Sequence, residues 1–209
     1  MTNADQNDPL RAYVSEKIGS LQSGYLSDQQ WQWAPAAATL ANLRRAVVRE
    51  PGEDPTVWAV MFDGWPFRAV GDEPTEYERA AHAALTLYAI HQQSKRQKRM
   101  HQEGQSLGFA VGQLSRRVVS ADATRRRFDA LTTAQSFGEI LHHGRGLVTQ
   151  LRAADIALDY GLLARHLVQL QRPEHADRAR LRWARDYYRP AAPSEDQPVT
   201  SDNTEGDQA

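Results

Sequence analysis

Apolar residues recur along almost the whole chain at intervals of three and four, the spacing that places side chains on one face of an α-helix. Clusters of β-branched residues, which would favour strands, are scarce. Stretches rich in Pro and Gly interrupt the pattern and separate the predicted helices. With 209 residues and 41% apolar composition, the chain can bury a sizeable core. The sequence therefore predicts an all-α protein.

Capping residues predict several helix boundaries. Asp8 can cap a first helix that has Pro9 in its first turn and ends at Gly24. A second helix is predicted to begin at Pro35, with a buried face formed by Leu40, Leu43 and Val47. Further helices are predicted over residues 57–62, 74–93, 107–117, 136–153 and 173–188, and from about residues 122 and 159.

The apolar pattern disappears over residues 94–105, where four basic residues fall within five positions. Such residues repel one another unless a polyanion relieves them, so we expect a solvated basic loop. The loop is predicted to divide an N-terminal helical part, residues 1–93, from a C-terminal helical bundle, residues 106–190, as two small packed bundles. Residues 191–209 are acidic and rich in Pro, Ser and Asp, and they are predicted to form a disordered tail.

Charge is divided along the chain in a way that the net charge of -1 hides. Residues 79–190 hold 19 basic and 9 acidic side chains, whereas residues 50–78 hold 8 acidic side chains and one basic one. Of the 25 basic residues 22 are Arg, whose planar guanidinium binds phosphate through two hydrogen bonds and stacks on bases. A GC-rich genome is an alternative explanation of that ratio, but it does not explain the clustering. The clustered bases indicate a phosphate-binding surface.

Nine of these bases occur between positions 94 and 127 in three groups: Lys95, Arg96, Lys98 and Arg99; Arg116 and Arg117; and Arg125, Arg126 and Arg127. The second group ends a predicted helix, where cations complement the helix dipole. The third group lies near the start of a predicted helix, where cations are electrostatically unfavourable. This triplet therefore needs a reason beyond local stability, and phosphate binding supplies one. The acids of residues 50–78 are interpreted as solvated loop charges, or alternatively as a surface for a basic partner.

Three patterns that could indicate chemistry are weak. Residues 104–108 have the G-x-S-x-G spacing of a hydrolase nucleophile, but the polar residues before them do not form the buried strand that this motif requires. Ser106 is therefore interpreted as a helix cap, with a serine hydrolase as an alternative. Glu139 and His142 have the spacing of a di-iron helix, but no second such pair exists, and the seven His residues are interpreted as surface or packing residues.

The sequence contains no cysteine and no glycine-rich phosphate-binding motif. We therefore predict no disulfide, no thiol catalysis, no cofactor and no metal site. The five Trp residues are interpreted as core or interface residues rather than as stacking platforms for bases. Residues 1–8 are polar, without the pattern of a signal peptide, and no apolar run is long enough to span a bilayer. The expected location is the cytoplasm, without membrane contact.

Six short segments occur in a specific order and spacing: Leu43–Arg45, Ala83–Ser94, Met100–His101, Ser106–Gly108, Arg126–Phe128 and Trp183–Tyr188. Together they resemble the CasB family, the small subunit of the type I-E CRISPR Cascade complex. The resemblance extends from about Ala36 to Tyr188. It implies an all-α fold of two small helical bundles, no enzymatic activity, and two copies within a ribonucleoprotein that contains other Cascade subunits, CRISPR RNA (crRNA) and target DNA.

The resemblance also implies binding to nucleic acid without sequence preference. In Cascade the crRNA pairs with one DNA strand and displaces the other, forming an R-loop that the subunit is expected to stabilise. The residues to which the resemblance and the charge pattern carry this role are Arg44, Arg45, Lys95, Arg96, Lys98, Arg99, Arg116, Arg117, Arg125, Arg126, Arg127 and Arg145. The alternative hypothesis is a helical scaffold protein whose basic face binds an acidic protein partner.

Overall fold

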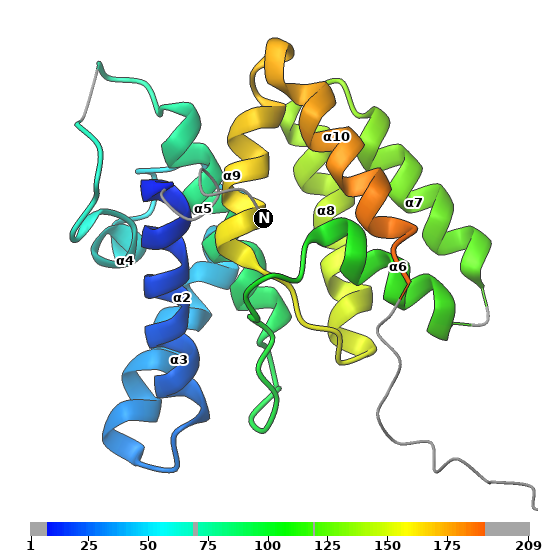
Figure 1. Cartoon of the computed structure of the whole chain (residues 1–209). Helices are drawn as coiled ribbons and strands as arrows, with labels where there is room; N and C mark the ends of the chain where they lie inside the picture. Colours follow the sequence, from blue (N-terminus) through cyan, green and yellow to red (C-terminus); the bar gives the residue numbers. More distant parts are fainter. Residues whose placement is uncertain (1–7, 69–70, 119, 191–209) are drawn as a thin grey trace, which may run out of the picture.

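The computed structural model describes residues 8–68, 71–118 and 120–190. These residues form α-helices, one 3₁₀ turn (Pro55–Val57) and no strand beyond an isolated bridge, so the predicted all-α class is confirmed (Figure 1). The helices are α2 (Pro9–Leu26), α3 (Gln30–Ala46), α4 (Trp58–Phe62), α5 (Glu76–His91), α6 (Leu107–Arg117), α7 (Ala121–Thr133), α8 (Phe137–Ala153), α9 (Tyr160–Leu170) and α10 (Pro173–Tyr187). The predicted tail lies outside the described residues.

The helices pack in a lateral order that places α5 and α9 centrally (Figure 1). Helix α9 packs against α2, α5 and α10, and α5 packs also against α3 and α8. On the far side, α6 packs against α7 and α10. The predicted boundary at residues 94–105 coincides with the loop between α5 and α6. The division of the chain into two bundles at this loop stays a prediction.

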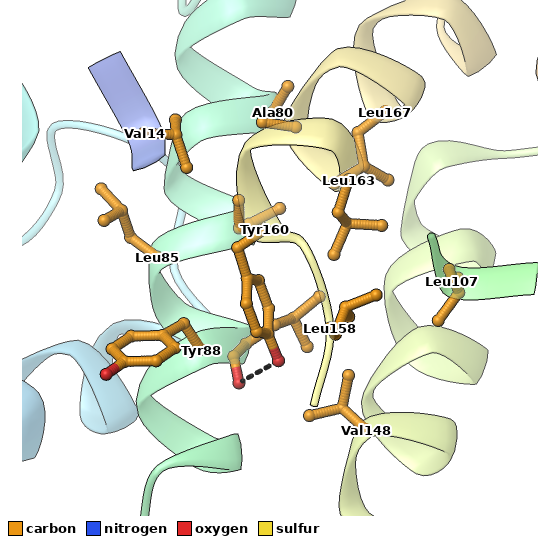
Figure 2. Packing of buried hydrophobic residues seen from close by; sticks show 14 of the residues in the cluster. Val14, Ala80, Leu85, Tyr88, Leu107, Val148, Leu158, Tyr160, Leu163 and Leu167 are labelled. Atoms are coloured by element: carbon orange, nitrogen blue, oxygen red, sulfur yellow. Dashed lines mark hydrogen bonds between the residues drawn. The ribbon is translucent and has the colours of Figure 1, made fainter. Parts of the chain in front are cut away.

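Tyr160 lies at the centre of the core, where α9 meets α5 (Figure 2). Its side chain is fully buried, and its ring contacts that of Tyr88 edge-on at a centroid distance of 5.4 Å. The Tyr160 hydroxyl lies 2.9 Å from Nδ1 of His91 and 3.4 Å from the carbonyl oxygen of Leu87. Burial raises the pKa of Tyr160 well above its ordinary value. This contact ties α9 to the C-terminal half of α5, where the candidate site lies.

Two glycines bring α6 and α10 into backbone contact. A Cβ added at Gly108 would lie 2.1 Å from the carbonyl oxygen of Trp183, and one at Gly112 would lie 2.3 Å from that of Tyr187. No side chain fits between the helices at these positions. The close contact holds the C-terminal end of α6, with its two arginines, beside the end of α10.

Four local predictions in the helices differ from the structure. Helix α3 begins at Gln30 rather than Pro35, which lies inside the helix; a turn in which Ser27 accepts a hydrogen bond from the Gln29 amide at 3.1 Å leads into it. Val47 is only half-buried, and Ala46 takes the buried position. Helix α7 begins at Ala121, one residue before the predicted start, but the Arg triplet lies in its second turn rather than at its start. The first helix likewise continues two residues beyond the predicted end.

Four of the seven histidines are packing residues, namely His82, His91, His101 and His166. His91 is fully buried in α5, and this burial is the main cause that lowers its pKa to about 3. An unfolded histidine titrates near pH 6.5. The folded state therefore holds His91 neutral over a range of pH in which the unfolded chain protonates it.

Acidification should destabilise the protein through His91. Between pH 6.5 and about 3 the unfolded chain binds one proton more than the folded chain at this site, so the unfolding free energy falls as pH falls. We expect His91 alone to cost about 1.4 kcal/mol between pH 8 and pH 5.5. Urea unfolding at both pH values should show a smaller loss for His91→Gln and an unchanged loss for His142→Gln, at an exposed position. Equal losses in the wild type and His91→Gln would contradict this assignment.

Candidate nucleic-acid interface

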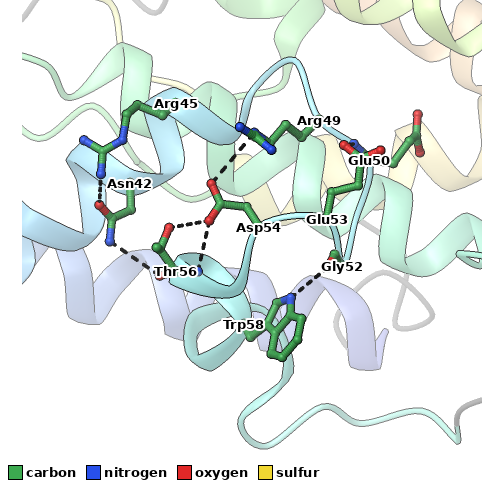
Figure 3. Close-up of polar contacts among 9 residues, drawn as sticks. All are labelled: Asn42, Arg45, Arg49, Glu50, Gly52, Glu53, Asp54, Thr56 and Trp58. Atoms are coloured by element: carbon green, nitrogen blue, oxygen red, sulfur yellow. Dashed lines mark hydrogen bonds and ion pairs between the residues drawn. The ribbon is translucent and has the colours of Figure 1, made fainter.

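Arg44 and Arg45 lie in the last turn of α3, where cations are favoured by the helix dipole. The guanidinium of Arg44 is half-buried and donates to the carbonyl oxygen of Ala89 at 3.5 Å. Arg45 is exposed, and its guanidinium donates to Oδ1 of Asn42 (Figure 3). The two arginines predicted from the Leu-Arg-Arg segment thus extend from the end of α3, and Arg44 reaches the last turn of α5.

Arg152 reaches the same turn of α5 from the opposite side. It lies in the last turn of α8 and donates to the carbonyl oxygen of Ile90 at 3.5 Å and to Oε1 of Gln93 at 2.8 Å. Carbonyl groups at a helix C-terminus lack helical partners and attract cations. Two guanidinium groups, from α3 and α8, therefore meet at consecutive carbonyls of α5.

Arg152 was not among the residues predicted from the sequence, because it is an isolated base in a helix with few charges. A signal was available in its spacing of seven residues from Arg145, which places both side chains on one face of α8. The two arginines therefore share a side of the molecule with the end of α5.

Electrostatic repulsion accompanies this convergence. Burial is the main cause that lowers the pKa of Arg44; the nearby charges of Arg45 and Arg152 lower it further, and Tyr25 opposes them. An arginine remains charged at physiological pH, so the proximity of the three guanidinium groups creates a local excess of positive potential. An anion placed among them would relieve the repulsion.

A groove of about 360 Å³ lies over α5 between α3 and α8. Its floor includes Thr86 and Leu87, and Val48 and Arg145 line its two sides. The floor residues precede Ala89 by less than one helical turn, so the groove leads toward the carbonyls that Arg44 and Arg152 contact. Of the predicted residues only Arg145 lines the groove itself, and Arg49 and Glu50 line it as well. We use the name groove arginines for Arg145 together with Arg44, Arg45 and Arg152, which do not line the groove but lie in the last turns of α3 and α8.

The basic loop is only partly the solvated segment that the sequence predicted. Lys95 and Lys98 both pair with Asp155, the latter at 3.6 Å. Arg96 donates to the carbonyl oxygens of Tyr25 and Ser27, at 2.7 and 3.3 Å. Arg99 is exposed, whereas Met100 and His101, in the second half of the loop, are buried. The solvated interpretation holds for the exposed first half of the loop and is wrong for Met100 and His101, because residues distant in sequence fold against that second half.

The remaining predicted bases form a second group where α6 and α7 meet. Arg116 donates to the carbonyl oxygen of Tyr187 at 3.4 Å, and Arg125 pairs with Asp129 at 2.9 Å and contacts the Tyr188 hydroxyl. The other three, Arg117, Arg126 and Arg127, are exposed. Arg127 also lines a depression with Ala153, the residue after Arg152. We name these five residues the corner arginines; the depression that Arg127 lines brings them close to the C-terminal end of α8, which carries Arg152.

The acidic segment has internal roles that the sequence did not predict. Hydrogen bonds from Thr56 are the main cause that lowers the pKa of Asp54, which also lies 4.0 Å from Arg49 (Figure 3). Glu50 pairs with Arg79 at 3.6 Å, and Glu76 pairs with Arg172 at 2.7 Å. These carboxylates are therefore structural ion pairs and caps as well as loop charges.

The other candidate sites have structural explanations. The hydroxyl of Ser106 caps α6 by accepting from the Phe109 amide at 3.2 Å and donates to Asp186 at 2.5 Å. Within the described ranges, no three His, Asp or Glu side chains converge as metal ligands would.

The tryptophans only partly follow the interpretation as core or interface residues. Trp183 is fully buried, but Trp31 is 71% exposed. None of the helices described has the length and apolar character needed to cross a membrane.

Comparison with known proteins identifies the family. Residues 39–188 match the family model of CRISPR-associated protein Cse2. The structure is similar to CasB from Thermobifida fusca, with a TM-score of 0.73 and 35% identity over 87% of this chain and 99% of that chain. A Cse2-family protein from Thermus thermophilus gives a TM-score of 0.58 and 25% identity over 84% of this chain and 97% of that chain. A comparison with curated proteins gives no match. The chain therefore belongs to the Cse2 family of CRISPR-associated proteins, the CasB family that its sequence resembles.

Proposed function

We propose that this protein is a non-catalytic, nucleic-acid-binding subunit of the type I-E Cascade ribonucleoprotein. It binds phosphate backbones without sequence preference and stabilises the R-loop by holding the separated strands. Its partners are crRNA, target DNA, other Cascade subunits and a second copy of the chain. Family membership supports the place in Cascade, and the groove arginines support the mode of binding.

The observation that carries the proposal is the approach of Arg44 and Arg152 to consecutive carbonyl oxygens of α5, with Arg45 beside them. A phosphate among these guanidinium groups accepts several charge-assisted hydrogen bonds and relieves their repulsion. Such contacts recognise the backbone, not the bases. Because exchange of a DNA duplex for an RNA–DNA duplex is nearly balanced in free energy, a few contacts of this kind decide whether the open state persists.

Binding of the full-length protein to labelled single-stranded and duplex DNA tests the proposal. We expect affinities that do not depend on base sequence, and the logarithm of the affinity should fall linearly with the logarithm of salt concentration. The slope should be roughly 0.7 to 0.9 for each phosphate contacted. Absence of binding at low salt would contradict the proposal and favour the scaffold hypothesis, in which the basic face binds an acidic protein.

Asp155 competes with phosphate for Lys95 and Lys98, so its removal should strengthen binding. The hydrogen bond from Lys95 is the main cause that lowers the pKa of the Asp155 carboxyl group, which is therefore ionised at neutral pH. Asp155 has a left-handed backbone, φ 55°, which Asn tolerates better than most residues. We expect Asp155→Asn to bind DNA about threefold more tightly, with a steeper salt dependence. Asp177→Asn, whose partner Arg180 is outside the predicted binding residues, is the matched control and should bind as the wild type does; weaker binding by Asp155→Asn would contradict the competition.

A further inference from the structure

The basic loop is built around the buried side-chain amide of Gln92, the residue that follows α5. Nε2 of Gln92 donates to the carbonyl oxygens of Lys95 and Lys98, at 2.6 and 2.8 Å. Oε1 of Gln92 accepts from the amide of Met100 at 3.1 Å and from the hydroxyl of Tyr88 at 3.2 Å. A glutamine amide has two donor hydrogens and two acceptor lone pairs, and all four are used. The amide therefore fixes three backbone positions within six residues.

A second buried glutamine fixes the end of the loop. Gln22 of α2 donates to the carbonyl oxygen of His101 at 3.2 Å and accepts from its amide at 2.8 Å. The neighbouring backbone pairs with the segment before α9, because the Leu158 amide donates to the Met100 carbonyl oxygen at 3.1 Å. The loop is thus held on its inner side by groups that water does not reach.

This inner frame leaves the basic side chains on the outer side of the loop. The carbonyl groups of Lys95 and Lys98 are directed to the buried amide, and Lys98 and Arg99 are exposed. The ammonium groups of Lys95 and Lys98 meet at one carboxylate, that of Asp155. The loop therefore already accommodates one oxyanion, the Asp155 carboxylate, between two cations.

We propose that Gln92 is a positioning residue that preforms residues 95–99 as a phosphate-binding loop for the nucleic-acid backbone. The inference rests on the proposed function and adds to it the residue that orders the loop. Gln92 does not contact the ligand. Its effect is to remove, before binding, the entropy cost of ordering the backbone that carries four long basic side chains.

The test combines Gln92→Met with removal of the loop charges. Met has a similar volume but no hydrogen-bonding amide, so Gln92→Met should weaken DNA binding about tenfold. In a loop-neutral background carrying Lys95→Gln, Arg96→Gln, Lys98→Gln and Arg99→Gln, the same substitution should have little further effect, because the bases it positions are gone. Gln97→Met, at an exposed position of the same loop, is the matched control and should bind as the wild type does. Circular dichroism checks that each variant is folded.

Equal weakening by Gln92→Met in both backgrounds would overturn the proposal, because the effect would then not act through the loop bases.

A measurement on the wild type covers the case in which Gln92→Met does not fold. Trypsin should cut slowly after residues 95–99 in the folded protein and rapidly in the unfolded chain; rapid cutting in the folded protein would also overturn the proposal. If the loop-neutral variant binds like the wild type while reversal of Arg44 and Arg45 abolishes binding, only the loop proposal fails. If the wild type does not bind DNA, both the loop proposal and the proposed function fail.

Discussion

Reversal of charge at Arg44 and Arg45, by Arg44→Glu and Arg45→Glu together, should weaken DNA binding about a hundredfold. Each hydrogen bond to a charged group contributes roughly 1.5 kcal/mol or more, and two such contacts correspond to that factor. The slope of the logarithm of affinity against that of salt concentration should decrease by about 1.4 to 1.8, because two phosphate contacts are lost. Fluorescence anisotropy over a series of salt concentrations measures both quantities.

The matched control places the same charge change elsewhere on the surface. Arg178 and Arg185 are exposed on α10, outside both arginine groups, and lie seven residues apart on one face of that helix. Their reversal to Glu should change affinity slightly through the net charge, an effect that salt screens over about 10 Å, and should leave the slope unchanged. Equal effects of the two double variants, or an unchanged slope for Arg44→Glu with Arg45→Glu, would exclude Arg44 and Arg45 from the binding site.

Removal of the Asp159 carboxylate should cause the largest loss of stability. Asp159 is fully buried; its carboxylate pairs with Arg11 at 3.1 Å and accepts from the amides of Gly104 and Leu162, each at 2.8 Å. The last of these hydrogen bonds caps α9. Loss of one partner of a buried ion pair costs about 3 to 5 kcal/mol. Asp159→Ala should therefore lower the unfolding free energy by that amount, as measured by urea denaturation.

Asp177→Ala is the control for this prediction. Asp177 also pairs with an arginine, Arg180 at 3.2 Å, but its side chain is 93% exposed. Water and salt screen such a pair, so we expect almost no change in the unfolding free energy. A loss of similar size in the two variants would show that burial is not what makes the Asp159 contact important.

The all-α fold class and several helix caps could be predicted from the sequence because the patterns that indicate them are local. Asp8, Ser106 and Asp159 each accept a hydrogen bond from an amide two or three residues later, so a short segment contains the whole interaction. The role of Asp159 as the partner of Arg11 was not predictable in this way. Those residues are 148 positions apart and meet only because α2 packs on α9.

The same distinction applies to the candidate site. Arg44 and Arg45 could be predicted as binding residues because their segment resembles the family. The segment alone does not indicate that Arg44 reaches α5, which the structure shows. Arg152 was missed because its importance depends on the packing of α8 against α5. The neutralisation of Lys95 and Lys98 by Asp155, 60 positions after Lys95, was missed for the same reason. A count of charges along the chain predicts where cations are concentrated but not which of them are already paired.

The lifetime of the R-loop tests the central claim most directly. Cascade assembled with crRNA and either the wild-type chain or the Arg44→Glu, Arg45→Glu chain can be loaded on target DNA and challenged with competitor at several salt concentrations. We predict a longer-lived R-loop with the wild type, and an advantage that shrinks as salt rises because it depends on phosphate contacts. Equal lifetimes at low salt, with both chains retained in the complex, would contradict the claim that these arginines hold the open strands.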